Sequence, residues 1–150
     1  MKLTRGKQSG IRYGQKKQTG QTDTEQLIKI ANYLFTEYKI SVKREWYIIF
    51  DIETDEILKI KDHVEREDLR DNGLDIAYAK NPDLLWFDKY GMWIIEIDGA
   101  VHDRKVKKTL ERNALFIKNH VKLIVVNIAD LKELDIDMFN YIDQKLTEMR

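Results

Sequence analysis

Two apolar segments separated by a short turn limit the possible folds of this chain more than any other feature. The segments are residues 84–87 and 92–98, and the residues between them, Asp-Lys-Tyr-Gly, are typical of a turn. Apolar segments joined in this way predict an antiparallel β-hairpin. We expect its second strand to end at Gly99.

The remaining segments predict helices and strands around this hairpin. Apolar spacing favours helices over residues 22–38 and 104–119, and a last helix that ends near Met149. Apolar runs favour strands over residues 42–50 and 121–126, whereas the acidic stretch 51–75 could hold a strand at 56–60 and a helix at 62–70. The order helix, strand, hairpin, helix, strand, helix is typical of an α/β protein, with a mixed sheet flanked by helices.

Each predicted helix has a side that we expect to be buried. Thr22 and Glu25 have the spacing of a capping box, which would place the start of the first helix at Thr22. The residues at core spacing are Leu27, Ala31, Leu34 and Tyr38 in the first helix, Val106, Leu110, Asn113 and Ile117 in the second, and Leu134, Met138, Ile142 and Leu146 in the last.

Length and composition exclude several classes of protein. The chain has 150 residues, 43% of them hydrophobic, which suits one domain with a core. It has no cysteine, so a disulfide scaffold and zinc sites built from thiolates are excluded. No apolar run approaches the roughly 20 residues of a membrane span, and the sequence MKLTRGKQSG at the start has no apolar signal segment. We therefore expect an intracellular protein (cytoplasm, nucleoid or host cell) with no membrane partner.

Positive and negative charges cancel in total but not along the chain. Lysine plus arginine and aspartate plus glutamate each number 26, yet residues 1–22 contain bases and no acid. This segment has few apolar residues to bury, so we expect a flexible basic arm before a single domain of residues 23–150. The arm is either a solubilising tail or an electrostatic tether for phosphate groups. Its basic residues are Lys2, Arg5, Lys7, Arg12, Lys16 and Lys17.

The hairpin is expected to bring acidic residues together. Side chains alternate between the faces of a strand, so Glu96 and Asp98 point the same way. A two- or four-residue loop pairs positions whose numbers sum to 179, which puts Asp83 opposite Glu96, whereas a three-residue loop would change this register. Two carboxylates so placed repel unless a proton or cation lies between them. Oxygen ligands suit Mg²⁺ or Mn²⁺, although the same acids could lie on a solvated strand edge.

The residues around this pair resemble a known family. Asn81-Pro82-Asp83 followed by Glu96-Ile97-Asp98-Gly99-Ala100-Val101-His102 resembles the PD-(D/E)XK nuclease superfamily. It is most similar to the branch related to very-short-patch-repair endonucleases, with its E-x-D-G-x-x-H string. The resemblance covers about residues 23–128 and is loose outside residues 81–102. It implies a restriction-endonuclease-like fold and a metal-dependent nuclease.

The resemblance also implies roles for individual residues. Asp83 and Glu96 match the metal-binding acids, and the backbone carbonyl of Ile97 would complete the protein ligands of Mg²⁺. His102 matches a histidine that could act as a general base. Glu25 matches a glutamate on the first helix, although a capping box would explain Glu25 without a catalytic role.

The family pattern is broken at one catalytic position. Asp98 stands where the superfamily usually has a lysine, which agrees with the E-x-D-G branch but removes a cation. His102 or Lys105 would have to replace that lysine, and Asp98 could orient His102 or bind metal. If the site is inactive, the domain would instead be a nuclease-fold module that binds DNA or a protein partner.

A basic helix face close to the acids predicts contact with DNA. Four cations of the helix 104–119 lie opposite its apolar side, and with the arm they would hold phosphates. They are Arg104, Lys105, Lys108 and Arg112. We therefore expect a Mg²⁺-dependent DNA endonuclease acting in repair, recombination or mobile-element processing. It would be a monomer or, through the hairpin aromatics, a homodimer. A third hypothesis is an unrelated interaction domain that uses the acidic stretch.

Overall fold

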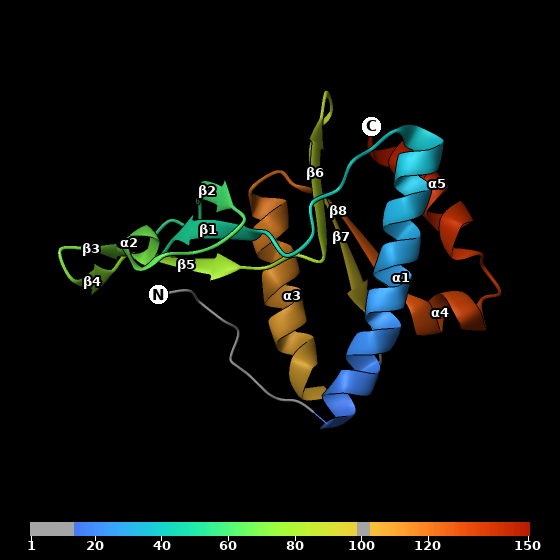
Figure 1. Cartoon of the computed structure of the whole chain (residues 1–150), viewed down its shortest axis with the longest axis horizontal. Helices are drawn as coiled ribbons and strands as arrows, with labels where there is room; N and C mark the ends of the chain where they lie inside the picture. Colours follow the sequence, from blue (N-terminus) through green and yellow to red (C-terminus); the bar gives the residue numbers. More distant parts are fainter. Residues whose placement is uncertain (1–13, 99–102) are drawn as a thin grey trace.

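A mixed α/β architecture surrounds the predicted hairpin (Figure 1). The computed structural model describes the backbone of residues 14–98 and 103–150 and the side chains of residues 23–98 and 107–150. The elements in chain order are α1 (Gly14–Tyr38), β1 (Tyr47–Asp51), β2 (Ile57–Lys61), α2 (Arg66–Leu69), β3 (Arg70–Asp71), β4 (Leu74–Asp75), β5 (Ala77–Lys80), β6 (Leu84–Asp88), β7 (Gly91–Asp98), α3 (Asp103–Lys118), β8 (Lys122–Asn127), α4 (Ile128–Glu133) and α5 (Met138–Met149).

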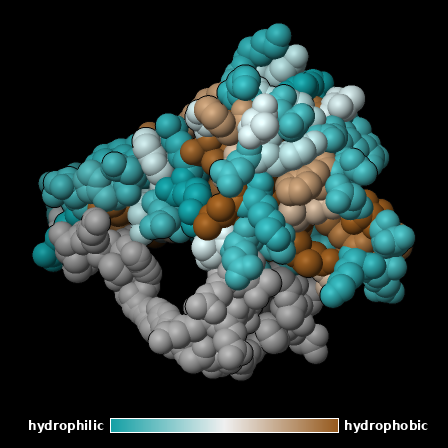
Figure 2. Space-filling view, turned by 45° about the vertical axis from the view of Figure 1, so that its right-hand side comes forward, coloured by the Kyte–Doolittle hydropathy of each residue, from teal (hydrophilic) through white to brown (hydrophobic). Residues whose placement is uncertain are grey.

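One face of the molecule is largely polar. The face turned forward in Figure 2, on the side of α1, α4 and α5, is largely hydrophilic, with hydrophobic side chains between the polar ones. No helix within the described ranges is both long enough and apolar enough to cross a membrane.

β6 and β7 form the predicted hairpin in the predicted register. Leu84 lies opposite Ile95 and Trp86 opposite Trp93, so the paired residue numbers sum to 179. Gly91 begins the second strand with φ at 129°, a conformation that L side chains rarely adopt. β8 lies parallel to β7 on its other side, giving the strand order β6-β7-β8. α3 is the crossover connection that a parallel pair requires.

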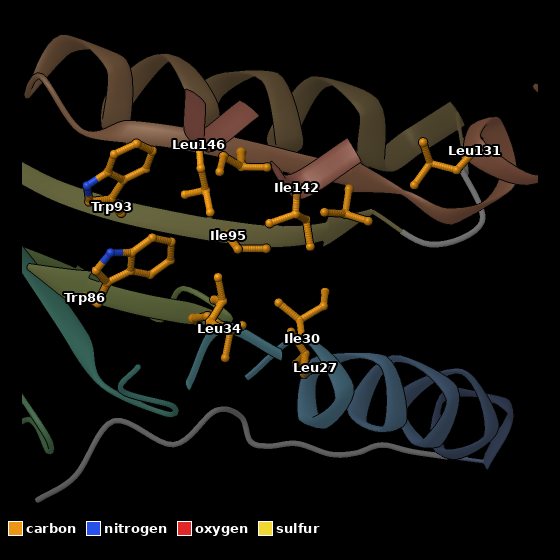
Figure 3. Close-up of a cluster of buried hydrophobic side chains, with 12 residues drawn as sticks. Leu27, Ile30, Leu34, Trp86, Trp93, Ile95, Leu131, Ile142 and Leu146 are labelled. Carbon is orange, nitrogen blue, oxygen red and sulfur yellow. The ribbon is translucent and has the colours of Figure 1, made fainter. Parts of the chain in front are cut away.

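One face of this sheet packs against α1, α4 and α5 (Figure 3). The rings of Trp86 and Trp93 stack with their centroids 5.5 Å apart, and Ile95 extends the same apolar surface. Burial of each such side chain contributes roughly 1.5–3 kcal/mol relative to leaving it in water. The helices supply the other labelled side chains of this cluster, Leu27, Ile30, Leu34, Leu131, Ile142 and Leu146.

The opposite face of the sheet packs against α3 and β1. Leu85 and Ile94 point to this face because they alternate with the stacked tryptophans. Phe116 of α3 covers them together with Phe50 of β1, and the two rings lie 6.4 Å apart. β1 is the central strand of a second sheet of order β2-β1-β5. Because both faces of the β6-β7-β8 sheet are covered, its strands are apolar on both sides.

α1 begins earlier than the sequence predicted. It starts at Gly14 rather than near Thr22, so Thr22 and Glu25 lie inside the helix and the predicted capping box is wrong. Lysine and glutamine are good helix formers, and the low apolar content before Thr22 hid this tendency. Lys16 and Lys17 of the predicted arm therefore belong to α1. The other basic residues of that arm lie outside the described residues: Lys2, Arg5, Lys7 and Arg12.

Hydrogen bonds fix α1 against α5. The hydroxyl of Tyr33 donates to the carboxylate of Asp143 at 2.7 Å, and the hydroxyl of Tyr38 donates to the same carboxylate. Burial and this hydrogen bond raise the pKa of Tyr38 to about 12, so its hydroxyl remains a donor at neutral pH. Tyr33 also stacks on Phe139, with 4.4 Å between the centroids. These contacts set the direction of α1 and of the residues that precede Leu27.

α3 packs on a different side from the one predicted. Leu110 and Ile117, expected in the core, have 62% and 61% of their surface exposed, whereas Leu115 and Phe116 are buried. The helix has two short apolar stripes, and periodicity alone does not determine which one is covered. The larger buried surface of Phe116 decides between them, because that residue fills the space between the β6-β7-β8 sheet and β1.

The predicted last helix is two helices. α4 ends at Glu133, and Leu134, expected in the core, is 67% exposed. Asp135 adopts a φ of 55°, and the side chain of Asp137 accepts the N–H of Asn140 to cap α5. Of the other elements, β1 and β8 lie in predicted strands, and β2 and α2 form within the ambiguous acidic stretch. The strands β3, β4 and β5 have no counterpart among the predicted elements.

The orientation of α3 predicts a large loss of stability on substitution of one residue and a small change at its neighbour. Phe116→Ala leaves a cavity between the two sheets and is expected to lower the free energy of unfolding by about 3–5 kcal/mol. Ile117→Ala, the matched control on the exposed side, is expected to change it by less than about 1 kcal/mol. Urea denaturation measures both, and equal losses would contradict this orientation.

Candidate active site

The hairpin holds Asp83 against Glu96 through two reciprocal hydrogen bonds. The backbone N–H of Asp83 donates to Oε2 of Glu96 at 3.2 Å, and the backbone N–H of Ile97 donates to Oδ2 of Asp83 at 2.8 Å. Each carboxylate therefore reaches the backbone of the opposite strand, one step beyond the last strand pair, Leu84 with Ile95. The structure brings these two acids together as the register predicts.

Glu96 is a buried acid that lacks full compensation of its charge. It is 2% exposed, and burial raises its pKa well above the ordinary range for a glutamate. The negative charge of Asp83 raises this pKa further, whereas Arg112 lowers it. Oε1 of Glu96 is buried and has no hydrogen-bond partner. The site is therefore unfavourable for the ionised glutamate unless a further positive charge approaches.

Arg112 provides part of that positive charge. Its Nε lies 3.5 Å from Oε1 of Glu96, close enough for an ion pair, but neither atom has a hydrogen-bond partner. The sequence placed Arg112 on the solvent-facing side of its helix among residues that contact DNA. The solvent-facing direction is wrong, because α3 turns the side with Leu115 and Phe116 inward and carries Arg112 towards β7. Contact of Arg112 with DNA stays a prediction.

Asp23 of α1 joins the acids of the hairpin. Partial burial raises its pKa, and the charges of Asp83 and Asp98 raise it further, so Asp23 lies within their field. Four acids from α1 and the hairpin are therefore electrostatically linked near the open end of the hairpin: Asp23, Asp83, Glu96 and Asp98. Mutual repulsion between these negative charges favours a cation near them.

Asp23 is the acid of α1 that lies in the field of the hairpin acids, whereas the catalytic role of Glu25 stays a prediction. Glu25 is exposed, and two residues along a helix correspond to a turn of about 200°, so Glu25 points away from the side that carries Asp23. A signal for Asp23 was present, because it precedes the buried Leu27 by four residues and Ile30 by seven. The predicted capping box hid this signal by placing the helix start at Thr22.

Several other predicted site residues are only partly located. His102 lies outside the described residues, as do the side chains of Arg104 and Lys105 on α3 and of Lys16 and Lys17 on α1. Lys108 is exposed, as the sequence predicted. Ile97 is half-buried and contributes its N–H to Asp83.

The donor set fits a small divalent cation with few protein ligands. Among the residues that the structure describes, no three acids or histidines come close enough together to hold a metal by themselves. Mg²⁺ commonly takes one or two carboxylates and completes its shell with waters and substrate phosphates. The unpartnered Oε1 of Glu96 beside the carboxylate of Asp83 offers that number of oxygen donors.

Comparisons with protein-family models, with curated proteins and with solved structures give no match. Inference about this site therefore depends on its own geometry and charges.

The buried charge of Glu96 predicts how stability depends on pH. Because burial raises the pKa of Glu96 above the ordinary value of about 4.3, the unfolded chain releases this proton at a lower pH than the folded chain does, so the free energy of unfolding falls as pH rises between the two values. Glu96→Gln removes this loss. Without divalent cations, the variant is expected to be more stable than the wild type at pH 7.

Arg112→Gln provides the opposite control in the same measurement. It leaves Glu96 without its only ion-pair partner in the described part of the chain, and should lower stability at pH 7. Chemical denaturation across pH 5–8 measures all three proteins. If the Glu96→Gln protein is less stable than the wild type over this whole range, the buried charge of Glu96 does not destabilise the folded state.

Proposed function

We propose that the chain is a Mg²⁺- or Mn²⁺-dependent DNA endonuclease with a restriction-endonuclease-like fold. The observation that carries this proposal is the buried Glu96 held against Asp83 with an unpartnered carboxylate oxygen. Its support is the E-x-D-G-x-x-H string, the mixed sheet flanked by helices and the cation of α3 beside the acids. A small nuclease of this kind would act in DNA repair, recombination or mobile-element processing.

Each residue of the site has a role in phosphodiester hydrolysis. Asp83 and Glu96, with the carbonyl of Ile97, would hold the metal, which activates a water and stabilises negative charge on the phosphorus centre. His102 has a side chain that titrates near neutrality, which suits proton transfer to or from that water. Asp98 would orient His102, and Asp23 would order waters around the metal.

Arg112 would take the role of the lysine that the family pattern has and this chain lacks. Its Nε lies 3.5 Å from Glu96 and its side chain is 29% exposed, so the guanidinium is held close to the acids and remains accessible. A guanidinium cannot lose its proton at neutral pH, and its planar donors match phosphate oxygens. It would therefore stabilise the charge that develops on the phosphate.

The same ion pair also supports the alternative, a nuclease-fold module that binds DNA or a protein partner without cutting. If the guanidinium remains on Glu96, it competes with a metal for that carboxylate. Binding of DNA without cleavage in either Mg²⁺ or Mn²⁺ would favour this alternative.

The metal ligands predict a loss of both cation binding and cleavage. Asp83→Ala and Glu96→Gln are expected to slow nicking of supercoiled plasmid by about 100-fold or more, because the metal loses a carboxylate. Mn²⁺ should raise the thermal midpoint of the wild type and not that of either variant. A wild type that shows no cleavage of duplex, branched or mismatched DNA with either metal would overturn the proposed activity.

Two acids on α1 give a matched test of the site. Asp23→Ala should slow nicking by about 10-fold or more, because it removes a charge linked to Asp83 and Asp98. Glu25→Ala should change the rate by less than about twofold, since Glu25 is exposed on the far side of the same helix. The reverse order of the two rates would restore Glu25 as the functional acid.

A further inference from the structure

A pocket of about 480 Å³ lies between α3 and β5, directly beside the candidate active site. β5 contributes Tyr78 and Lys80, and α3 contributes Arg112 and Leu115. Arg112 belongs to both places, because it lines the pocket and its Nε lies 3.5 Å from Oε1 of Glu96. A molecule in the pocket would therefore lie next to the paired carboxylates.

One wall of the pocket presents a fixed aromatic ring. Tyr78 stacks on Phe50 with the centroids 5.5 Å apart, and its hydroxyl donates to Oδ1 of Asp55 at 2.7 Å. These two contacts hold the ring from its edge and from one face. Leu115 adds apolar surface to the same pocket. Nζ of Lys80 lies 5.9 Å from the centroid of the Tyr78 ring, so a flat group that stacks on this ring would lie beside an ammonium.

The charged groups of the pocket are of both signs. Lys80, Arg112 and Lys118 are its cations, and Asp55 and Glu111 are its acids. Lys118 also lies 3.9 Å from a carboxylate oxygen of Asp55, so part of its charge is already balanced. This mixture suits a ligand that carries one negative group together with hydrogen-bond donors, rather than a bare polyanion.

These features match a single nucleotide in size and chemistry. The volume falls within the roughly 300–1,000 Å³ of pockets that enclose small organic ligands, and is far larger than a phosphate ion requires. The base of a nucleotide stacks on aromatic side chains, and its amino and imino groups donate to carboxylates. The phosphate of the nucleotide binds lysine and arginine. The pocket offers each of these partners.

We propose that this pocket receives one unstacked nucleotide of the bound DNA strand, next to the phosphodiester that is cut. The proposal rests on the proposed function for the source of the nucleotide. That the ligand is a nucleotide is inferred from the residues that line the pocket. Arg112 then links the two places, with its guanidinium between the phosphate of the unstacked nucleotide and the acids.

The first test uses free deoxynucleoside 5′-monophosphates in EDTA, measured by calorimetry with the full chain. The wild type is expected to bind them more tightly than inorganic phosphate or deoxyribose 5-phosphate. Ala114→Trp fills the pocket from an exposed position on α3 and should weaken binding at least 10-fold. Ala129→Trp, at an exposed position on α4, is the matched control and should bind as the wild type does.

Lys118→Glu tests the same pocket by charge, so that the result does not depend on one bulky side chain. It should weaken nucleotide binding, whereas Lys132→Glu on α4 should not. Equal binding of inorganic phosphate and nucleotides, or no effect of Ala114→Trp and Lys118→Glu, would overturn the nucleotide pocket.

The second test uses DNA with 2-aminopurine at successive positions, in EDTA or Ca²⁺. Unstacking should raise its fluorescence at one position with the wild type and with Ala129→Trp, and not with Ala114→Trp. Nucleotide binding and unstacking without cleavage in Mg²⁺ or Mn²⁺ would reject the endonuclease and support the pocket. Normal cleavage by Ala114→Trp without any unstacking signal would reject the pocket and leave the endonuclease.

Discussion

Between β6 and β7, Trp86 lies opposite Trp93, and this register determines what the neighbouring side chains can face. Because side chains alternate along a strand, the same pairing sends the tryptophans towards α1 and α5 and sends Leu85 and Ile94 towards α3. It also brings Asp83 to Glu96 at the open end of the hairpin. A slip of one residue would exchange the two faces and separate the acids.

Burial and negative charge oppose each other at this end of the hairpin. A glutamate that is 2% exposed beside a second acid is costly for the folded state, and Arg112 at 3.5 Å offsets only part of this cost. The apolar packing on both sides of β7 supplies the stability that allows such a group to persist. One oxygen of Glu96 accepts the N–H of Asp83 across the hairpin, whereas the other has no hydrogen-bond partner and is the oxygen that the proposed cation would use.

The site lies where three separate elements meet the sheet. α1 brings Asp23 because Tyr33 and Tyr38 anchor this helix to Asp143 of α5. α3 brings Arg112 because Phe116, one helical turn later, fills the space against β1. The second sheet then encloses the pocket beside Arg112 through β5. The positions of the acids, of Arg112 and of the pocket therefore depend on packing contacts between residues that are far from the site in the sequence.

The sequence by itself determined the hairpin, its register and the pairing of Asp83 with Glu96, because these follow from local alternation and a two-residue loop. It also determined the α/β class, α3 and β8, but not the division of the last predicted helix into α4 and α5. Only the tertiary structure decided which stripe of α3 is buried and which acid of α1 faces the hairpin, Asp23 rather than Glu25. The reason is physical: a strand pair is specified by its own residues, whereas the rotation of a helix depends on the surfaces against which it packs.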